Sequence, residues 1–517
     1  MGFIMPTTIL DIFAETVKEY PSKTAINTID NQMTYSRLQA DAMQLGYALY
    51  KETDGERNVP IVVFIDKGCE CLAAMLGVLY SGNCYVPMDI KTPIDRLHSI
   101  LETLGTKRLL TTIREKDRLD KIGYTEDVII YEQLLDSCSS NADVKTILKD
   151  IQRTIVDTDI MYILFTSGST GIPKGVAIRH RSVLDYVQAF TAEVPISKDD
   201  IVGNQVPFYV DMSLKDIYMS LSVGATICVI PQKYFMTPKK VLTYLEENRV
   251  TMLMWVPTAY NIVAQFDALG KVRPSGLHKF LFSGEGMPIP VYSYWRRYYP
   301  EAVYIQQYGP TEITGACTTY MVTRDYKLNE TIPIGKPFRN TNIVLLDEED
   351  REVTKDMAGV AGEICVSGTC LAAGYYNNSE KTEEVFVQSP LVKAYPSKIY
   401  RTGDLARWDE EGNLVFISRK DYQIKHGGRR IELGEIETAV YSVPLIKACC
   451  CVHNALKDII VLYYVGEIEE KELRTIVKEK LPQYMIPGKF IRSDDLPKLA
   501  NGKLNRKQMM NWANEED

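Results

Sequence analysis

Residues 162–176 carry the feature that most constrains this chain, an apolar run that passes directly into a loop of hydroxyls, glycines and one lysine, YILFTSGSTGIPKGV. The apolar run has the pattern of a buried β-strand. Hydroxyl groups can donate hydrogen bonds to an anion, and glycines let backbone N–H groups close around it without a Cβ in the way. The segment therefore predicts a strand that ends in a phosphate-binding loop.

The phosphate-binding residues expected in this loop are Thr166, Ser167, Gly168, Ser169, Thr170, Gly171 and Lys174. The loop is not a Walker A motif, because Pro173 stands in place of its second glycine and Gly175 in place of its Ser/Thr. A P-loop kinase or GTPase is thereby disfavoured. A flexible Ser/Gly linker is the alternative, and the strand pattern before the loop argues against it.

The order of the predicted elements indicates an α/β chain of several units. Apolar strands alternate with amphipathic helices from residue 7 to about 150, as in 61–65, 71–79 and 85–88, which predicts parallel sheets flanked by helices. The pattern continues through strands at 251–256 and 279–282, and changes at about 330–417 to short strands with turn signals, a β-rich subdomain. A compact α+β segment follows. We expect a large core at 1–418, a hinge at 419–421 and a small mobile domain at 422–517.

Composition excludes several classes of function. A chain of 517 residues is too long to fold around a single hydrophobic core. Its net charge of −8 provides no basic surface that would attract nucleic acid. Apolar runs fall short of the ~18 residues of a membrane span, and no signal segment is visible, so a cytoplasmic monomer is expected. The eleven cysteines have no metal spacing and fit free thiols. The five histidines form neither a two-histidine metal pattern nor a hydrolase motif, so no zinc site is expected.

Six further motifs accompany the loop, in the order NQVPFYVD at 204–211, FSGE at 282–285, YGPTE at 308–312, GEICVSG at 362–368, YRTGD at 400–404 and NGK at 501–503. Together they resemble the adenylate-forming superfamily over nearly the whole chain. Within it, the chain is similar to the amino-acid adenylation domains of nonribosomal peptide synthetases and to the D-alanine–carrier-protein ligases. The resemblance implies an AMP-forming ligase that uses ATP and Mg²⁺.

The resemblance also implies roles for individual residues. Lys503 would contact both the substrate carboxylate and the phosphate, with Thr166, Lys174 and Glu312 as further catalytic residues, and Glu312 would bind Mg²⁺. Tyr308 would lie against adenine, and Asp404, near Arg419, would accept the ribose hydroxyls. The remaining nucleotide-binding positions are Gly284, Glu285, Gln307, Gly309 and Thr311. For Lys503 and Asp404 the alternatives are a surface turn and a helix cap.

Asp211 would pair with the substrate α-ammonium, which favours an amino acid over a simple carboxylic acid; the alternative is a helix N-cap. Lys215, four residues later, indicates an acidic substrate side chain, unless it pairs with Asp211 or Asp216 or extends to water. By contrast, the local sequence around Asp211, Ser283 and Asn501 most resembles the D-alanine–carrier ligases, whose substrate pocket is small. The other substrate-binding residues expected are Met212, Thr258, Leu281, Ser283, Gln307, Gly315, Ala316 and Lys503.

Asp421 marks the expected hinge, about which the small domain would rotate to present residues 425–435 to a thiol. The acceptor would be the phosphopantetheine thiol of a carrier protein supplied in trans. The segment departs from the family pattern at Ser418, where glycine is usual, and at Gly427, where arginine is usual, which leaves the carrier interface open. The expected function is amino-acid adenylation followed by carrier loading; the alternatives are a D-alanine–carrier ligase and an acyl-CoA or aryl-CoA synthetase.

Overall fold

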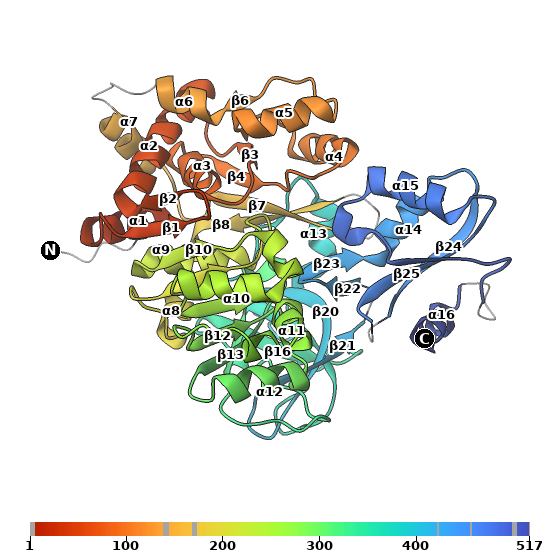
Figure 1. Ribbon diagram of the computed structural model, residues 1–517. Coiled ribbons are helices and arrows are strands. Elements are labelled where there is room, and N and C mark those ends of the chain that lie inside the picture. Colours follow the sequence, from red (N-terminus) through yellow and green to blue (C-terminus); the bar gives the residue numbers. More distant parts are fainter. Residues whose placement is uncertain are drawn as a thin grey trace.

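The computed structural model describes residues 6–137, 144–167, 173–420, 423–454, 457–498 and 504–515. Three sheets form a large body, and a smaller unit built from the end of the chain projects from one side of it (Figure 1). The expected α/β architecture, with a β-rich subdomain and a small α+β domain, is confirmed.

The first sheet has seven strands, parallel in its centre. Alternate residues of its strand β3 pack on opposite faces, Ile61 and Val63 toward α3 and Val62 and Phe64 toward α4. In order, the strands are β18 (Gly374–Tyr375), β8 (Lys174–Arg179), β7 (Ile160–Thr166), β4 (Cys84–Pro87), β3 (Pro60–Phe64), β5 (Leu109–Thr111) and β6 (Ile129–Ile130). The surrounding helices are α2 (Tyr35–Glu52), α3 (Cys69–Tyr80), α4 (Ile94–Leu104), α5 (Ile113–Lys121), α6 (Tyr131–Ser137) and α7 (Val144–Gln152).

Two glycines let helices α2 and α3 approach closely. A Cβ on Gly46 would lie 2.4 Å from Cβ of Tyr80, and one on Gly77 would lie 2.7 Å from Cβ of Leu45. Neither position has room for a side chain without separating the helices. Every residue of α3 except Glu70 is buried, which explains why the rest of its sequence is apolar on all sides.

The second sheet has nine strands and supplies most of the candidate substrate pocket. In order, they are β15 (Lys336–Pro337), β14 (Thr318–Met321), β13 (Val303–Tyr308), β12 (Lys279–Phe282), β11 (Met252–Trp255), β9 (Ile201–Asn204), β10 (Thr226–Val229), β1 (Thr24–Asn27) and β2 (Gln32–Thr34). Helices α10 (Pro238–Glu247), α11 (Pro257–Gln265) and α12 (Ile289–Tyr298) pack on one face. Helices α1 (Ile9–Glu19), α8 (His180–Glu193) and α9 (Ser220–Val223) contribute to the cluster on the other.

The expectation of parallel sheets needs one refinement. The central pairs of the nine-stranded sheet are parallel, but β1–β2, β13–β14 and β14–β15 are antiparallel, as are β7–β8 and β8–β18 in the seven-stranded sheet. Both sheets are therefore mixed. Short loops join β7 to β8 and β13 to β14, and a short connection between neighbouring strands permits only antiparallel pairing.

The third sheet is the β-rich subdomain, with β16 (Thr341–Leu346), β17 (Gly362–Gly368), β20 (Lys398–Trp408) and β19 (Phe386–Gln388) in order and β21 (Leu414–Arg419) paired to β20. Helix α13 (Ser379–Val385) precedes β19. All its pairs are antiparallel, which agrees with the alternating sequence pattern and the turn signals.

The small unit starts with the hairpin of β22 (Gln423–His426) and β23 (Arg429–Glu432), which lies between the body and the rest of the unit in Figure 1. A second sheet follows, with β24 (Ile446–Asn454), β25 (Ile459–Gly466) and β26 (Lys489–Arg492). The helices are α14 (Leu433–Tyr441), α15 (Glu470–Lys480) and α16 (Arg506–Glu515). Asp421, the expected hinge, lies outside the described residues, so the domain boundaries stay a prediction.

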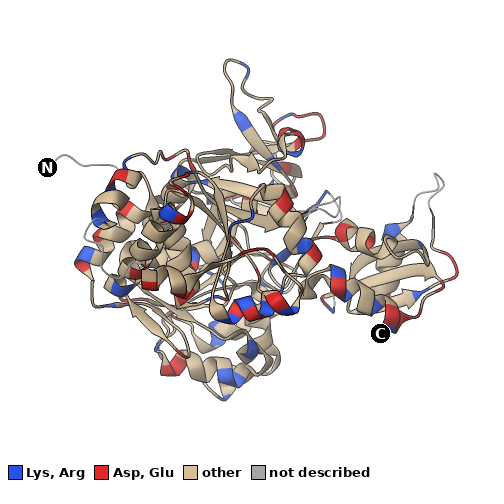
Figure 2. Ribbon diagram, turned by 90° about the horizontal axis from the view of Figure 1, so that it is seen from above, with Lys and Arg blue, Asp and Glu red and all other residues tan. Residues whose placement is uncertain are grey.

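Basic and acidic residues are interspersed along the helices and loops in Figure 2. Among the helices of the described ranges, none combines the length and apolar character needed to cross a membrane.

Candidate active site

The end of the β7–β8 hairpin brings together two of the predicted phosphate-binding residues. Thr166 and Lys174 are register partners across the antiparallel pair. The Thr166 hydroxyl is buried without a hydrogen-bond partner in the described structure. Nζ of Lys174 lies 3.7 Å from Glu432 and 5.3 Å from the ring centre of Tyr375. The hairpin thus presents a hydroxyl and an ammonium at its tip; the loop residues Gly168, Ser169, Thr170 and Gly171 lie outside the described residues.

Glu312 is a buried carboxylate that the β22–β23 hairpin reaches directly. Arg430 donates from Nη1 to both carboxylate oxygens at 2.8 Å, and the hydroxyl of Tyr375 donates to one of them at 2.7 Å. Burial alone would raise the pKa of Glu312, but the charges of Arg430 and Lys174 outweigh it and hold that pKa below its usual value. Glu312 is therefore charged, and it is paired with the small domain in this arrangement.

Asp404 is held between two strands at another edge of the site. It pairs with Arg419 in the β20–β21 register, and Nη1 of Arg419 donates to its Oδ1 at 2.6 Å. The hydroxyl of Tyr308, the last residue of β13, donates to its Oδ2. Burial is the main cause that raises the pKa of Tyr308 well above the ordinary value, so this hydroxyl stays a donor. The structure thus places together the three residues expected near adenosine.

Two residues predicted for the substrate pocket, Lys215 and Gln307, carry polar atoms without partners in the described structure, and neither lines the cavity between the domains. Asp211 is partly buried, and its carboxylate accepts a hydrogen bond from the hydroxyl of Thr311 at 2.9 Å. Lys215, at the start of a π-helical turn Lys215–Met219, is fully buried, and its ammonium has no hydrogen-bond partner within the described ranges. Both amide atoms of the buried Gln307 are unpartnered there as well. Unsatisfied buried groups are costly, so each of these atoms calls for an explanation, and a bound ligand is one.

Burial sets the ionisation of these two charged groups. It raises the pKa of Asp211, against the hydrogen bond from Thr311 and the charge of Lys215. It lowers the pKa of Lys215 to about 8, against the nearby carboxylates of Asp216 and Asp211. No salt bridge joins Lys215 to either carboxylate among the described residues. A substrate that supplied counter-charges would relieve both penalties.

The other predicted pocket residues line or support this region. Gly315 has φ +81°, and a Cβ there would lie 2.8 Å from the ring of Tyr186, so only glycine fits. The hydroxyl of Thr258 donates to Glu285 at 2.6 Å. Met212 lines the cavity between the two domains, whereas three further residues are buried and do not line it: Leu281, Ser283 and Ala316.

The β22–β23 hairpin covers this cavity. Gly428 donates its backbone N–H to Glu285 at 2.6 Å, and the Ser167 hydroxyl donates to the Arg430 carbonyl at 2.9 Å. The cavity lining includes nine predicted site residues: Thr166, Ser167, Asp211, Met212, Gly284, Gly309, Thr311, Asp404 and Arg419. It also includes residues to which sequence reasoning assigned no individual role: Tyr209, Lys425, Arg429, Arg430 and Tyr484. Tyr484 lies far from every motif, so no local signal marks it.

Lys503 lies outside the described residues. Leu504, the next residue described, packs against the outer cluster of the β24–β25 sheet, and no residue of 504–515 lines the cavity. The site as described is therefore built without the C-terminal helix.

Comparison with known proteins agrees with this geometry. Residues 13–376 match the family model described as AMP-binding enzyme, and residues 435–503 match the AMP-binding enzyme C-terminal domain. Zwittermicin A synthase ZmaJ of Bacillus cereus is 30% identical over 97% of this chain and 94% of its own length. Tyrocidine synthase 1 of Brevibacillus parabrevis is 31% identical over 97% of this chain, and the chain spans 44% of that longer protein.

Two solved structures are similar over nearly the whole chain. Holo-PA1221, an NRPS protein containing adenylation and PCP domains, has a TM-score of 0.82 at 25% identity and covers 98% of this chain and 84% of its own. The Vibrio cholerae adenylation domain AlmE, in complex with glycyl-adenosine-5'-phosphate, has a TM-score of 0.85 at 20% identity and covers 100% of this chain and 99% of its own, which shows the shared fold. The chain therefore belongs to the AMP-binding enzyme family, as an AMP-forming adenylation enzyme of the nonribosomal peptide synthetase type.

Proposed function

We propose that this enzyme activates an amino acid with an acidic side chain, forming aminoacyl-AMP and pyrophosphate from ATP, and then loads the aminoacyl group onto a carrier protein. One observation carries the substrate assignment: the ammonium of Lys215 is fully buried and has no hydrogen-bond partner in the described structure. An unpaired buried charge costs several kcal/mol. A substrate carboxylate would remove this cost.

Asp211 supports an amino acid over a simple carboxylic acid. The residue is partly buried, its single described side-chain donor is Thr311, and desolvation raises the pKa of its carboxyl group. A substrate α-ammonium would supply positive charge beside it. A fatty or aryl acid, the substrate of the acyl-CoA and aryl-CoA synthetases, would leave Asp211 uncompensated.

The nucleotide would lie between Asp404 and the β7–β8 tip. Asp404 would accept the ribose hydroxyls, Tyr308 would contact adenine, and Lys174 would meet the phosphates. The carboxylate of Glu312 is a hard oxygen ligand that suits Mg²⁺, an ion that would neutralise phosphate charge when bound. Arg430 holds both oxygens of Glu312 in the present arrangement, so metal binding requires the hairpin to withdraw.

Carrier loading would use the arrangement seen here, in which residues 425–435 cover the cavity. A thiol acceptor, the phosphopantetheine arm of a carrier, fits this proposal, and the similar protein PA1221 contains adenylation and PCP domains. We place the hinge at 419–421 and the mobile domain at 422–517. The cysteines described are all free and buried, which fits a reducing compartment such as the cytoplasm.

The test is an ATP/pyrophosphate exchange panel with L-Glu, L-Asp, L-Gln, L-Asn, both enantiomers of alanine, and a fatty and an aryl acid. We expect Glu or Asp to exceed its amide at least ~100-fold in kcat/KM, because an unpaired buried charge costs several kcal/mol. Lys215→Met should abolish this preference and favour small neutral amino acids. Lys67→Met is the matched control, because Nζ of Lys67 already has partners in Asn204 and Gln205.

The control should lower all rates in parallel and leave the ratio of acid to amide unchanged. Preference of the wild type for D-alanine, with Glu and Asp inactive, would refute the acidic substrate and assign the chain to the D-alanine–carrier ligases. Activity with fatty or aryl acids alone would refute amino-acid activation altogether.

A further inference from the structure

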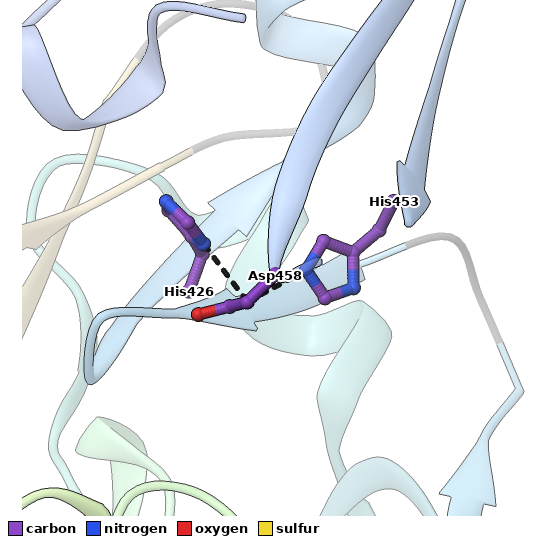
Figure 3. Close-up of side chains that lie close together, drawn as sticks. All are labelled: His426, His453 and Asp458. Atoms are coloured by element: carbon purple, nitrogen blue, oxygen red, sulfur yellow. Dashed lines mark hydrogen bonds and ion pairs between the residues drawn. The ribbon is translucent and has the colours of Figure 1, made fainter. Parts of the chain in front are cut away.

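Three potential metal ligands meet in the small domain, and none of them lines the cavity, although His426 directly follows Lys425, which does. His426 ends β22, His453 lies in β24, and Asp458 lies in the turn just before β25. Figure 3 shows both imidazoles next to the Asp458 carboxylate. Nδ1 of His426 lies 3.0 Å from Oδ1 of Asp458, and Nε2 of His453 lies 2.9 Å from the same atom. Over the ranges that the structure describes, this is the one group of its kind.

The spacing of these atoms fits a small divalent ion. With Zn–N and Zn–O bonds of about 2.0–2.1 Å and tetrahedral angles, ligand atoms are about 3.3 Å apart. All three ligand atoms lie within 4.8 Å of one another, and two of the separations are already close to that value. Small side-chain rotations would therefore open the space for an ion.

Exposure and backbone geometry also favour the site. The exposed fractions are 27% for His426, 19% for His453 and 42% for Asp458, so an ion can enter and water can take a fourth position. Asp458 has φ +48°, a left-handed conformation that fixes its direction within the turn. Among the charges nearest His426, Glu285 favours a bound cation and Arg429 opposes it.

We propose that His426, His453 and Asp458 form a binding site for a divalent transition-metal ion of the zinc type, with water completing four-coordination. Imidazole nitrogens suit zinc, whereas Mg²⁺ prefers all-oxygen sites, so this site is chemically distinct from the carboxylate proposed for the reaction. A bound ion would join the β22–β23 hairpin to the β24–β25 turn. That hairpin carries Gly428 and Arg430, whose contacts close the cavity.

The sequence does not indicate this metal site, because His426 is far from His453 and Asp458 along the chain. His426 and His453 come from different sheets, and only the packing of the hairpin against the β24–β25 turn brings them together. From their spacing in the sequence, the histidines were expected to form no metal site. This proposal replaces that expectation.

The experiment uses the full chain, stripped of metal, with Zn²⁺ as the probe in calorimetry and Co²⁺ as its spectroscopic substitute. We expect one equivalent of Zn²⁺ to bind in the presence of excess Mg²⁺, and Co²⁺ to give the absorption of a four-coordinate ion without thiolate bands. His453→Ala and Asp458→Asn should each weaken binding more than the ~10–100-fold caused by altering an outer-shell group. Asn tolerates the left-handed turn, which protects the fold of that variant.

His278→Ala is the matched control, because it removes an exposed histidine that lies outside the cluster. Zn²⁺ should raise the melting temperature of the wild type and of this control, but not that of the two ligand variants. The proposal is overturned if the wild type binds no stoichiometric Zn²⁺. It is equally overturned if binding survives both ligand substitutions or if Co²⁺ shows thiolate ligation, since the ion would then be at cysteines. None of these outcomes depends on the substrate of the enzyme.

Discussion

At the scale of single residues, the candidate site is marked by buried polar groups that lack hydrogen-bond partners. Lys215, Gln307 and Thr166 each place polar atoms in the interior without a partner in the part of the chain described. Leaving such atoms unsatisfied costs about 1–3 kcal/mol each, more for a charge. Of the three, Lys215 lies close enough to Asp211 for the two charges to interact, and a substrate bound there would supply the missing partner.

The pKa of Lys215 leads to a prediction on pH. Burial lowers this pKa to about 8, so the ammonium is mostly charged at pH 7 and mostly neutral at pH 9 in the free enzyme. Because kcat/KM reports the free enzyme, the ratio of kcat/KM for Glu over Gln should fall as pH rises through about 8. The measurement is pyrophosphate exchange with both substrates between pH 6.5 and 9.5. A ratio that stays constant over this range would show that Lys215 does not select the substrate.

A second residue-scale prediction concerns Lys503, whose role stays a prediction. Lys503→Ala should slow adenylate formation by ~10²–10³-fold or more, the usual loss when one preorganised charge is removed from a transition state. Transfer from a preformed adenylate to the carrier thiol should persist. Single-turnover assays of the two half-reactions separate these effects, and equal damage to both would contradict a role in one half-reaction only.

At the scale of elements, the β22–β23 hairpin joins the two domains. Its two-residue turn has φ +57° at Gly427 and +74° at Gly428, as a type I′ turn requires. This explains the departure from arginine at Gly427, since most side chains are strained in that conformation. From this turn the hairpin reaches Glu285 through Gly428 and Glu312 through Arg430.

The turn offers a matched pair of substitutions. A Cβ on Gly428 would lie 2.2 Å from Cγ1 of Val256 in the large domain, whereas one on Gly427 would meet nothing within 4 Å. Gly427→Ala and Gly428→Ala share the strain of positive φ, and only the second also prevents docking. Overpacking costs about 1–3 kcal/mol, so carrier loading should be roughly tenfold slower or more in Gly428→Ala than in Gly427→Ala. Equal loading rates in the two variants would argue against a docked hairpin during transfer.

At the scale of the whole molecule, three ion pairs among the described residues cross between the domains: one joins Lys174 to Glu432 at 3.7 Å, and the other two each involve a carboxylate that is almost fully buried. Arg96 of α4 pairs with Glu435 of α14, with side chains only 9% and 1% exposed, and Arg430 pairs with Glu312. Separating either pair without a replacement leaves a buried charge, which is costly. If Glu312 also binds Mg²⁺, as proposed, the two states of the enzyme compete for the same carboxylate.

The hinge gives the prediction at this scale. Asp421→Pro would fix φ near −65° and remove a torsion that rotation of the small domain needs. Adenylation should survive better than carrier loading, measured by pyrophosphate exchange and by mass analysis of the loaded carrier. Unchanged loading in this variant would place the hinge elsewhere.

Local patterns were sufficient for much of the fold. The strands at Lys279–Phe282 and Thr341–Leu346 have the predicted bounds, because short apolar runs and the turn signals that flank them are local properties of the sequence. The family was likewise readable from short motifs, each of which must keep its residues to contact a nucleotide. What these predictions missed in the sheets was the antiparallel edges, since pairing direction depends on how strands meet in space.

The amino-acid sequence by itself determined the α/β architecture, the family and the candidate residues along its motifs. Only the tertiary structure decided which of those residues meet. It placed Arg430 on Glu312 across 118 positions and left Lys215 without a partner beside Asp211 and Asp216, against the simplest local pairing. It also brought His426 to Asp458 and His453. The physical reason is that pairing between charged groups depends on packing, burial and distance in the folded chain, and none of these follows from separation along the sequence.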